Sequence, residues 1–392
     1  MAIVPPNRGR ANPAPTTINR TLWRQLVVAR ALTAVFKKRM NHTKEVSMRL
    51  IIPISLILLL LAILLPILFV GQADLPITPK ETEPPELIPS PDSVDSSLPI
   101  GHGQDEALLL QVLVGDTVET MSMQDFLYGA VAAEMPARFH PEALRAQAIA
   151  ARTYTLHRLL ISPSPRHPTA DVCGSYVCCK AFLSPQRLRE RWGASYDHYS
   201  QIIRNAVSDT DGVILTYGDI PILAAFHAAS SGHTEASGAI WGSVPYLQSV
   251  ETFESAADVP NYYEETRLTF SAFRETALDG IPGAVLDYDQ KPYWISNLRY
   301  TDSGRVESLN IGGIDLGGAD FRRLFGLRST AIRFSFDADG IAITTRGHGH
   351  GVGMSQFGAN TMAHMGHSFE EILRWYYTKV NFNLMDAVLP FQ

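Results

Sequence analysis

The feature that most constrains this chain is an apolar run at residues 50–70. Its 21 residues carry no charge, and Ser55 alone has a hydrogen-bonding side chain. A helix of this length rises about 30 Å, which matches the hydrocarbon core of a bilayer. A cleaved signal peptide is the alternative, but its apolar core is shorter, about 7–15 residues. We therefore expect a retained transmembrane helix at residues 50–71.

Charges on the two sides of this run predict its orientation. Residues 74–105 are acidic and contain one positive charge, Lys80. The basic residues that lie just before the run include Lys37, Lys38, Arg39, Lys44 and Arg49. The positive-inside rule then places the basic segment at residues 1–49 in the cytoplasm and the rest of the chain outside it. Met40 and Met48 are alternative translation starts.

The exported part divides into a spacer and a folded body. Residues 72–105 are rich in Pro, Ser, Glu and Asp, which makes them a semi-extended linker too polar to bury a core. Residues 106–392 mix helical and strand patterns without regular alternation, so the expected fold class is α+β. The net charge of -6 leaves no overall basic footprint, and nucleic acid is not an expected partner.

Two helices stand out at the start of the body. A capping pattern of Ser122 and Asp125 begins the first helix, and Pro136 stops it after about residue 134. Pro141 begins the second helix at its first turn, and this helix runs to about residue 160. Further strands are expected at residues 108–114, 118–121, 212–217, 222–227, 306–311, 333–336 and 341–346, and a final helix at 369–377. The strands at 212–217 and 222–227 read as a hairpin around a Tyr-Gly-Asp turn.

Glu134 is the candidate catalytic residue on this helix pair. It lies at a helix C-terminus, where the helix dipole disfavours a negative charge. Apolar neighbours would also desolvate it, and both effects suit a general acid. Arg145 and Arg152 share one face of the second helix, since they are seven residues apart. The structural alternative is an ion pair between Glu134 and one of these arginines.

Three separated motifs resemble the stage II sporulation protein D family. They are YGAVAAEMP at 128–136 with LRAQAIAARTY at 144–154, then FHAASSGHTE at 226–235, then GHGHGVGMSQFGA at 347–359. The resemblance covers roughly residues 106–385. It implies a lytic transglycosylase of endospore formers, which thins septal peptidoglycan during engulfment of the forespore. Glu134 occupies the position of the family's catalytic glutamate.

The resemblance implies a reaction that needs a single carboxyl group and no cofactor. Glu134 would protonate the oxygen that bridges MurNAc and GlcNAc as the bond breaks. The carboxylate would then deprotonate the C6 hydroxyl of the same MurNAc, which closes on C1 to give a 1,6-anhydro end. Glycosidases usually need a second carboxylate for this work, and the sequence does not point to one.

The family resemblance also implies partners and a location. The expected substrate is a peptidoglycan glycan strand stripped of its stem peptides. The expected partners are a wall amidase and a membrane scaffold of the engulfment machinery. The body is expected between the mother-cell and forespore membranes. Two other functions stay open: a zinc-dependent amidase or peptidase with an open metal site near His348 and His350, and a non-catalytic glycan-binding modifier of an amidase.

The motifs supply a set of candidate substrate-binding residues. Small hydroxyl residues and histidine at a strand end suit sugar hydrogen bonding, and a glycine-rich loop lets backbone amides approach a ligand closely. A serine nucleophile is the alternative at residues 230–231, but the Gly-x-Ser-x-Gly elbow is missing. Arg152 has an alternative structural role as a salt-bridge partner. The candidates are Arg145, Arg152, Tyr154, His227, Ser230, Ser231, His350 and Gln356.

Aromatic residues near the later motifs are either sugar platforms or core residues. They are Trp241, Tyr246, Trp375, Tyr376 and Tyr377. We expect these aromatic residues to be core residues.

The three cysteines form one local cluster with a histidine. His167, Cys173, Cys178 and Cys179 lie within 13 residues, and thiolates with imidazole are zinc ligands. The spacing alone is unlike a paired zinc knuckle, but some members of the resembled family hold zinc in the corresponding loop. We expect a structural zinc ion here. A disulfide from Cys173 to Cys178 or Cys179, or free thiols, are the alternatives.

Overall fold

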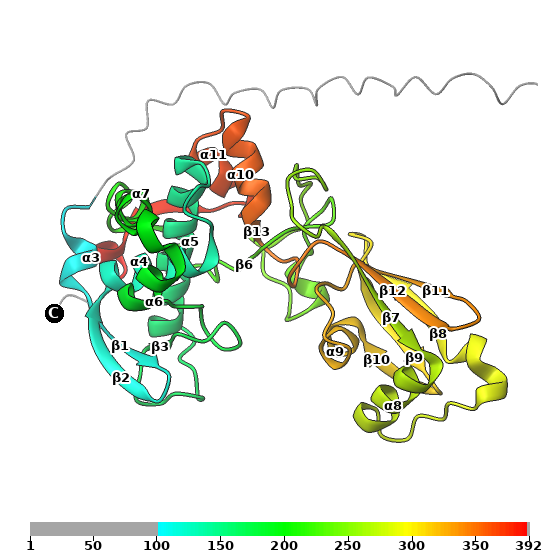
Figure 1. The fold of residues 1–392 in the computed structure, drawn as a ribbon. Coiled ribbons are helices and arrows are strands. Elements are labelled where there is room, and N and C mark those ends of the chain that lie inside the picture. Colours follow the sequence, from blue (N-terminus) through cyan, green and yellow to red (C-terminus); the bar gives the residue numbers. More distant parts are fainter. Residues whose placement is uncertain (1–100, 390–392) are drawn as a thin grey trace, which may run out of the picture. The chain divides into compact units, whose positions relative to one another are not determined.

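The computed structural model describes residues 101–389, and these residues form a mixed α+β body, as predicted (Figure 1). The predicted transmembrane helix at residues 50–71 and most of the predicted linker lie outside the described residues. Within residues 101–389, every helix is too short or too polar to cross a bilayer. Two hydrophobic cores organise the body. The buried residues of the first core lie within 110–247 and 352–385, and those of the second core within 273–343.

The first core begins with two of the predicted strands and the predicted helix pair. β1 (Leu109–Val114) pairs antiparallel with β2 (Thr117–Ser122), and β3 (Val172–Cys173) joins β1 in parallel. α4 (Met123–Glu134) starts where the Ser122 side chain accepts a hydrogen bond from the Asp125 backbone N–H. α5 (Pro141–Leu160) starts with its proline in the first turn. The predicted strands at 108–114 and 118–121 and both predicted helices are confirmed, whereas β3 was not predicted.

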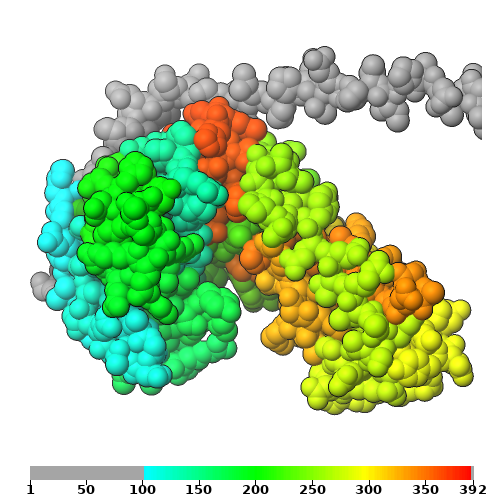
Figure 2. Space-filling model, viewed as in Figure 1, coloured from blue at the N-terminus to red at the C-terminus, as the bar shows by residue number. Residues whose placement is uncertain are grey.

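Three further helices of the first core pack against α5: α7 (Tyr196–Ser208), α10 (Gln356–His364) and α11 (Phe369–Tyr376). α6 (Pro185–Trp192) packs against α7. Most of α5 is buried, because its alanines let neighbouring helices approach its backbone closely. α10 and α11 come from the end of the chain and pack against α5, which the orange-red and teal surfaces show in Figure 2. Residues 352–385 therefore complete the first core, which α4 and α5 begin.

The predicted hairpin of residues 212–217 and 222–227 is partly wrong. β4 (Val213–Tyr217) pairs with β5 (Ile220–Pro221) on one side and with β14 (Asn381–Leu384) on the other. Pro221 has no N–H to donate to the ladder, and one further hydrogen bond, from the Ile222 N–H to the Leu215 carbonyl at 3.1 Å, ends the pairing. The chain then leaves this sheet, and β6 (Phe226–His227) pairs in parallel with β13 (Met354–Ser355). This parallel pairing brings the second and third sequence motifs together.

The second core lies between two antiparallel sheets and two helices. β7 (Tyr263–Thr269), β12 (Gly340–Arg346) and β11 (Ile332–Phe336) form one sheet, with β12 in the middle. β8 (Ile295–Tyr300), β9 (Val306–Ile311) and β10 (Ile314–Gly317) form the other, with β9 in the middle. α8 (Phe270–Gly280) and α9 (Gly318–Leu324) cover these sheets. The strands predicted at 306–311, 333–336 and 341–346 are confirmed. Short 3-10 helices occur at Gly193–Ser195, Ser237–Ala239, Tyr288–Tyr293 and Met385–Ala387.

The folded body starts before residue 106, where the linker was expected to end. α3 (Gln104–Ala107) packs against the first core, and Asp105 is 1% exposed. Asp105 forms an ion pair of 2.5 Å with Arg152 of α5. The placement of Asp105 in the linker is therefore wrong. The sequence could not show this, because an acidic residue that pairs with a buried arginine looks the same as an acidic linker residue.

Candidate functional site

Glu134 is the last residue of α4, and its side chain is partly buried. The backbone N–H of Ala181 donates to its Oε1 at 3.2 Å. The side-chain amide of Gln356 donates to its Oε2 at 3.4 Å. Both donors come from segments far from α4 in the sequence. The carboxyl group is therefore held from two sides while part of the residue remains accessible.

Neither arginine of α5 neutralises Glu134. Arg145 binds Asp209 at 2.6 Å and also pairs with Glu142. The Arg152 side chain is fully buried and takes Asp105 as its partner. The alternative of a structural ion pair between Glu134 and one of these arginines is therefore wrong.

These positions also bear on the substrate contacts expected of the two arginines. The guanidinium of Arg152 donates to the backbone carbonyl of Val213 at 3.0 Å as well as to Asp105, and it offers no accessible surface to a sugar. A structural role fits it. Arg145 is partly exposed, but two carboxylates already occupy its guanidinium.

Residues 181–183, called the clamp below, pack along α4 as far as its C-terminal end. The ring of Phe182 stacks on Phe126 of α4 with centroids 5.7 Å apart. The backbone N–H of Leu183 donates to the carbonyl of Gly129 at 3.2 Å. A Cβ at Gly129 would collide with the Phe182 ring and would lie 2.7 Å from the Leu183 carbonyl oxygen. Because Gly129 has no side chain, residues 181–183 can approach α4 closely enough for the Ala181 N–H to reach Glu134.

Lys180 places a buried cation beside this carboxyl group. The residue is 6% exposed, and its Nζ lies 3.2 Å from the ring centroid of Phe226 and 3.9 Å from that of Tyr154. Burial lowers the pKa of Lys180 to about 7, although the nearby charge of Glu134 acts in the opposite direction. Burial raises the pKa of Tyr154 to about 12. Tyr154, which the sequence predicts to bind substrate, contacts Lys180 through its ring.

Gln356 reaches Glu134 because a buried carboxylate fixes the start of α10. Ser355 caps this helix by accepting the N–H of Gly358 at 3.2 Å. The hydroxyl of Ser355 donates to Oε1 of Glu254, and the backbone N–H of Ser230 donates to the same oxygen at 2.6 Å. Glu254 thus ties the second motif to the third.

His227 and Ser230 form a close pair inside the site. Ser230 is fully buried, and its hydroxyl lies 2.6 Å from Nε2 of His227. Nδ1 of His227 lies 3.2 Å from the carbonyl of Val352, so this nitrogen carries the proton and Nε2 accepts. Burial, with the charges of His350 and Arg305, lowers the pKa of His227 well below its ordinary value. A buried hydroxyl cannot reach a substrate carbonyl, so the arrangement favours a structural pair over a serine nucleophile.

Two further predicted contacts lie near this pair. The Ser231 hydroxyl is buried and has no hydrogen-bond partner within residues 101–389. His350 is partly buried, and its Nδ1 accepts the backbone N–H of Val352 at 3.1 Å. Burial and the charge of Lys180 lower the pKa of His350 to about 3. The His350 ring lies 5.7 Å from that of His227.

Trp241 is the exposed aromatic residue at this end of the site. Its ring centroid lies 5.0 Å from that of His350, and the residue is 50% exposed. Tyr376 and Tyr377 are fully buried, and Tyr246 is 9% exposed, so these three are core residues as expected. Trp241 departs from that expectation and is available to a ligand.

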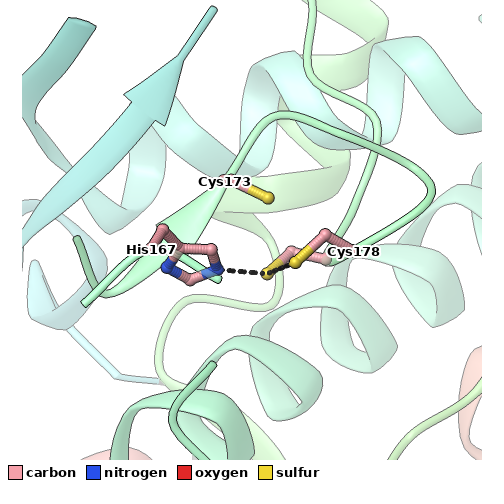
Figure 3. Close-up of side chains that lie close together, drawn as sticks. His167, Cys173 and Cys178 are labelled. Atoms are coloured by element: carbon pink, nitrogen blue, oxygen red, sulfur yellow. Dashed lines mark hydrogen bonds between the residues drawn. The ribbon is translucent and has the colours of Figure 1, made fainter. Parts of the chain in front are cut away.

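The four predicted metal ligands come together in the loop between α5 and α6. Their ligand atoms all lie within 4.8 Å of one another, in the cluster of His167, Cys173, Cys178 and Cys179. Nε2 of His167 lies 3.2 Å from Sγ of Cys179, and the sulfurs of Cys178 and Cys179 lie 3.9 Å apart (Figure 3). Adjacent cysteines therefore point to one place despite their awkward spacing. None of the three cysteines is in a disulfide, so the disulfide alternative is wrong.

The donors of this cluster fit a zinc ion. One imidazole nitrogen and three sulfurs are a usual set for a closed structural site. Nδ1 of His167 bonds to the carbonyl of Ala170 at 2.9 Å, which leaves Nε2 to face the sulfurs. Burial alone would raise the pKa of the Cys178 thiol, but hydrogen bonds from Ser164 and the neighbouring thiols lower it to about 7. Burial raises the pKa of Cys179 to about 12.

The zinc-hydrolase alternative needs a different metal centre, near His348 and His350. Within residues 101–389, the group with suitable ligand geometry is the Cys/His cluster alone, and it contains neither histidine. His348 is exposed, and its Nδ1 lies 3.1 Å from the guanidinium of Arg328. The geometry does not favour this alternative.

A separate cavity of about 290 Å³ lies beside the second core. Glu235, Thr301 and Arg305 line it, and none of its lining residues belongs to the predicted site.

Sequence reasoning missed three parts of the site: Lys180, Glu254 and the N–H of Ala181. Lys180 and Ala181 directly follow the cysteine cluster, and a lysine between a cysteine and apolar residues was the available signal. Glu254 lies outside every motif, so nothing local distinguished it.

Comparisons with known proteins identify the family of the chain. The model of a family described as "Stage II sporulation protein" matches residues 115–217. Stage II sporulation protein D of Bacillus subtilis is 36% identical over 274 residues, which cover 70% of this chain and 78% of that protein. The protein of the same name from Bacillus amyloliquefaciens is 35% identical, with coverage of 70% and 77%. A B. subtilis protein named "Amidase enhancer" is 27% identical over 64% of this chain and 39% of its own length.

Proposed function

Because the chain belongs to the stage II sporulation protein D (SpoIID) family, we propose that it is a lytic transglycosylase that cleaves septal peptidoglycan during sporulation. Residues 50–71 would anchor it, with the N-terminus in the cytoplasm and the body between the mother-cell and forespore membranes. The substrate would be glycan strands freed of stem peptides. A wall amidase would supply such strands, and a membrane scaffold would position the enzyme.

The observation that carries the proposal is the setting of Glu134. A general acid must be accessible, partly desolvated and free of a permanent counter-ion. Glu134 is partly buried, ends α4, and accepts only the N–H of Ala181 and the amide of Gln356 within residues 101–389. These two neutral donors orient the carboxyl group without fixing it as a carboxylate, as an arginine partner would.

In the proposed reaction Glu134 acts twice. Its carboxylic acid gives a proton to the bridging oxygen as the bond from C1 of MurNAc breaks. The carboxylate then takes the proton of the C6 hydroxyl, whose oxygen bonds to C1. The proton count on Glu134 is restored, and water is not consumed. Trp241 beside His350 offers a face on which a sugar ring could stack.

The Cys/His cluster would support this site structurally. His167, Cys173, Cys178 and Cys179 would hold a zinc ion, which would supply rigidity to the loop and take no part in the chemistry. The loop continues directly into Lys180 and Ala181, which lie against Glu134. The metal ligands are thus joined to the proposed catalytic residue through two residues of backbone.

The test is product analysis with the full-length chain in detergent. Peptide-stripped glycan strands should yield 1,6-anhydro-MurNAc ends, which mass spectrometry identifies. Glu134→Gln should lower the cleavage rate by about 10²–10⁴-fold, because it removes the proton transfer, and should leave strand binding intact. Anhydro products formed at the normal rate by Glu134→Gln would refute the proposal.

A second function rests on the relative named "Amidase enhancer". The chain would then bind glycan and stimulate an amidase without cleaving the strand. In that case Glu134→Gln would leave the stimulation of an amidase unchanged, and the wild-type chain alone would release no anhydro ends. The same assay with and without an amidase separates the two functions.

A further inference from the structure

A pocket of about 120 Å³ lies on the outer face of the sheet formed by β7, β12 and β11 (Figure 1). Ile332, Ile341 and Ile343 of this sheet belong to the second core. Successive side chains of a strand point to opposite faces, so Arg333 and Arg346 lie on the face that is turned away from that core. Both arginines line the pocket, and its lining contains no carboxylate.

Small residues leave this space open. The backbone N–H of Arg346 donates to the carbonyl of Ala331 at 3.0 Å, so these two residues lie side by side on neighbouring strands. Gly304, in the turn between β8 and β9, borders the same pocket, and an added Cβ at Gly304 would meet no atom within 4 Å. A methyl group and a hydrogen therefore stand where longer side chains would fill the space beside the two arginines.

Neither guanidinium is neutralised within the described part of the chain. Arg333 donates to a backbone carbonyl at 3.1 Å and lies over the ring of Tyr300 at 5.0 Å. The side chain of Arg346 forms no hydrogen bond and no ion pair among residues 101–389. Glu264 and Glu265 on β7 are each paired with a different arginine, at 3.3 and 3.5 Å. The positive charge at the pocket is therefore left without a protein partner in this part of the chain.

A third guanidinium adds to this positive charge. Arg305 directly follows Gly304 and is 1% exposed, and its guanidinium has no hydrogen-bond partner within residues 101–389. Burial lowers the pKa of Arg305 to about 10; the charge of Glu235 opposes this shift and that of Arg346 adds to it. Because like charges repel one another, an anion in the pocket would stabilise this group of arginines.

We propose that the pocket bordered by Arg333 and Arg346 is a binding site for a phosphate group. A guanidinium group pairs with phosphate through two parallel N–H donors. Two such groups match the charge of a phosphate dianion better than that of a single carboxylate. Thr344 in the lining adds a hydroxyl donor. The ligand would be free phosphate or a phosphate monoester, since both present the same dianionic group.

The competing explanation is that the two arginines only keep this sheet face hydrated. Exposed arginines are common and need no ligand. Hydration alone predicts weak binding of every anion, with a dependence on ionic strength but not on the charge or shape of the anion.

The experiment is a calorimetric titration of the full-length chain in uncharged detergent at constant ionic strength. The probes are inorganic phosphate, glycerol 3-phosphate, dimethyl phosphate and acetate. The first two are mainly dianions at about pH 7.5, and we expect them to bind about tenfold or more tightly than the two monoanions. Binding of inorganic phosphate alone would assign the site to free phosphate, and binding of both dianions would assign it to the phosphate group of either source.

Three variants connect the binding to the pocket. Arg346→Gln should weaken phosphate binding about tenfold or more, because it removes a charged donor. Ala331→Leu keeps both arginines but fills the space between them and the turn, and it should also weaken binding. Arg323→Gln is the matched control, since Arg323 is exposed and already pairs with Asp320; it should bind phosphate as the wild type does. Melting temperatures show whether each variant is folded.

Three results would overturn the inference. They are no measurable binding of phosphate to the wild-type chain, equal binding of acetate and phosphate, and phosphate binding that folded Arg346→Gln and Ala331→Leu leave unchanged. The inference goes beyond the proposed function and is separable from it. Release of anhydro ends by a chain that binds no phosphate would overturn the inference alone. Phosphate binding by a chain that releases no anhydro ends would leave it intact.

Discussion

At the scale of single residues, the carboxyl group of Glu134 is hydrogen-bonded by neutral groups, and Lys180 is the basic residue beside it. Glu134 receives two neutral donors. The arginines that could have neutralised it are held elsewhere by Asp105, Glu142 and Asp209. His227 and His350 are also neutral near pH 7, because burial lowers the pKa of each. This neutrality has a consequence for acid stability.

His227 should make the fold acid-sensitive below about pH 6.5, the ordinary pKa of an exposed histidine. The unfolded chain then binds a proton that buried His227 does not, since its folded pKa is lowered well below 6.5. The free energy of unfolding therefore falls as the pH falls, by about 1.4 kcal/mol per pH unit. Above pH 6.5 this contribution is complete and constant.

Urea unfolding at a series of pH values measures the effect against His227→Gln. Glutamine keeps both partners, since its amide donates to Val352 and its oxygen accepts from Ser230. The wild-type stability should drop more steeply than that of the variant between about pH 6.5 and 5. Parallel curves would show that His227 is protonated in the folded protein.

At the scale of elements, α4 presents Glu134 in a fixed position because residues 181–183 pack against this helix. Phe182 and Leu183 pack on Gly129, and this contact carries Ala181 to the carboxyl group. The contact joins the first motif to the loop that holds the cysteine cluster. The precision of the site therefore depends on how closely one helix and one loop approach.

Gly129→Ala should displace this segment. A helix alone would gain about 1 kcal/mol from the change, because alanine is the better helix former. The new Cβ would instead meet the Phe182 ring and the Leu183 carbonyl. Overpacking of this kind costs about 1–3 kcal/mol, so we expect net destabilisation and a lower cleavage rate.

The double variant Gly129→Ala/Phe182→Leu tests the cause. Leucine lacks the ring and should return part of the stability, but not all of it, because the Leu183 carbonyl still lies 2.7 Å from the new Cβ. Calorimetry gives the melting temperatures, and amide exchange reports the Ala181 N–H. If Gly129→Ala alone were more stable than the wild type, residues 181–183 would not pack tightly against α4.

At the scale of the whole molecule, local signals predicted the elements better than their partners. Capping by Ser122 and the proline at 141 predicted α4 and α5 with their bounds, because helix ends depend on nearby residues. The parallel pairing of β6 with β13 joins residues more than 100 positions apart, and no local pattern encodes it. Glu254 was missed for the same reason.

The candidate site shows the same division. Glu134, His227 and the metal ligands lie in recognisable motifs, and the structure brings each set together. Arg152 shows the opposite case. Its face on α5 was correctly placed, but its partner Asp105 belongs to a segment that composition assigns to the linker. Sequence reasoning therefore identified the chemistry of single residues and not the contacts that decide their roles.

Removal of the metal should weaken the first core, because the Cys/His cluster bridges two of its parts. Cys173 belongs to β3, which pairs with β1, and Cys179 leads into the clamp on α4. A bound ion stabilises the folded state in proportion to the logarithm of its concentration over Kd, about 4 kcal/mol at a thousandfold excess. We therefore expect one zinc ion per chain and a melting temperature that falls when a strong chelator removes it. Cys173→Ser should melt lower and respond less to zinc. Equal melting of the chelated and zinc-loaded wild-type chains would mean that hydrogen bonds among the thiols, and not a metal, hold this loop in place.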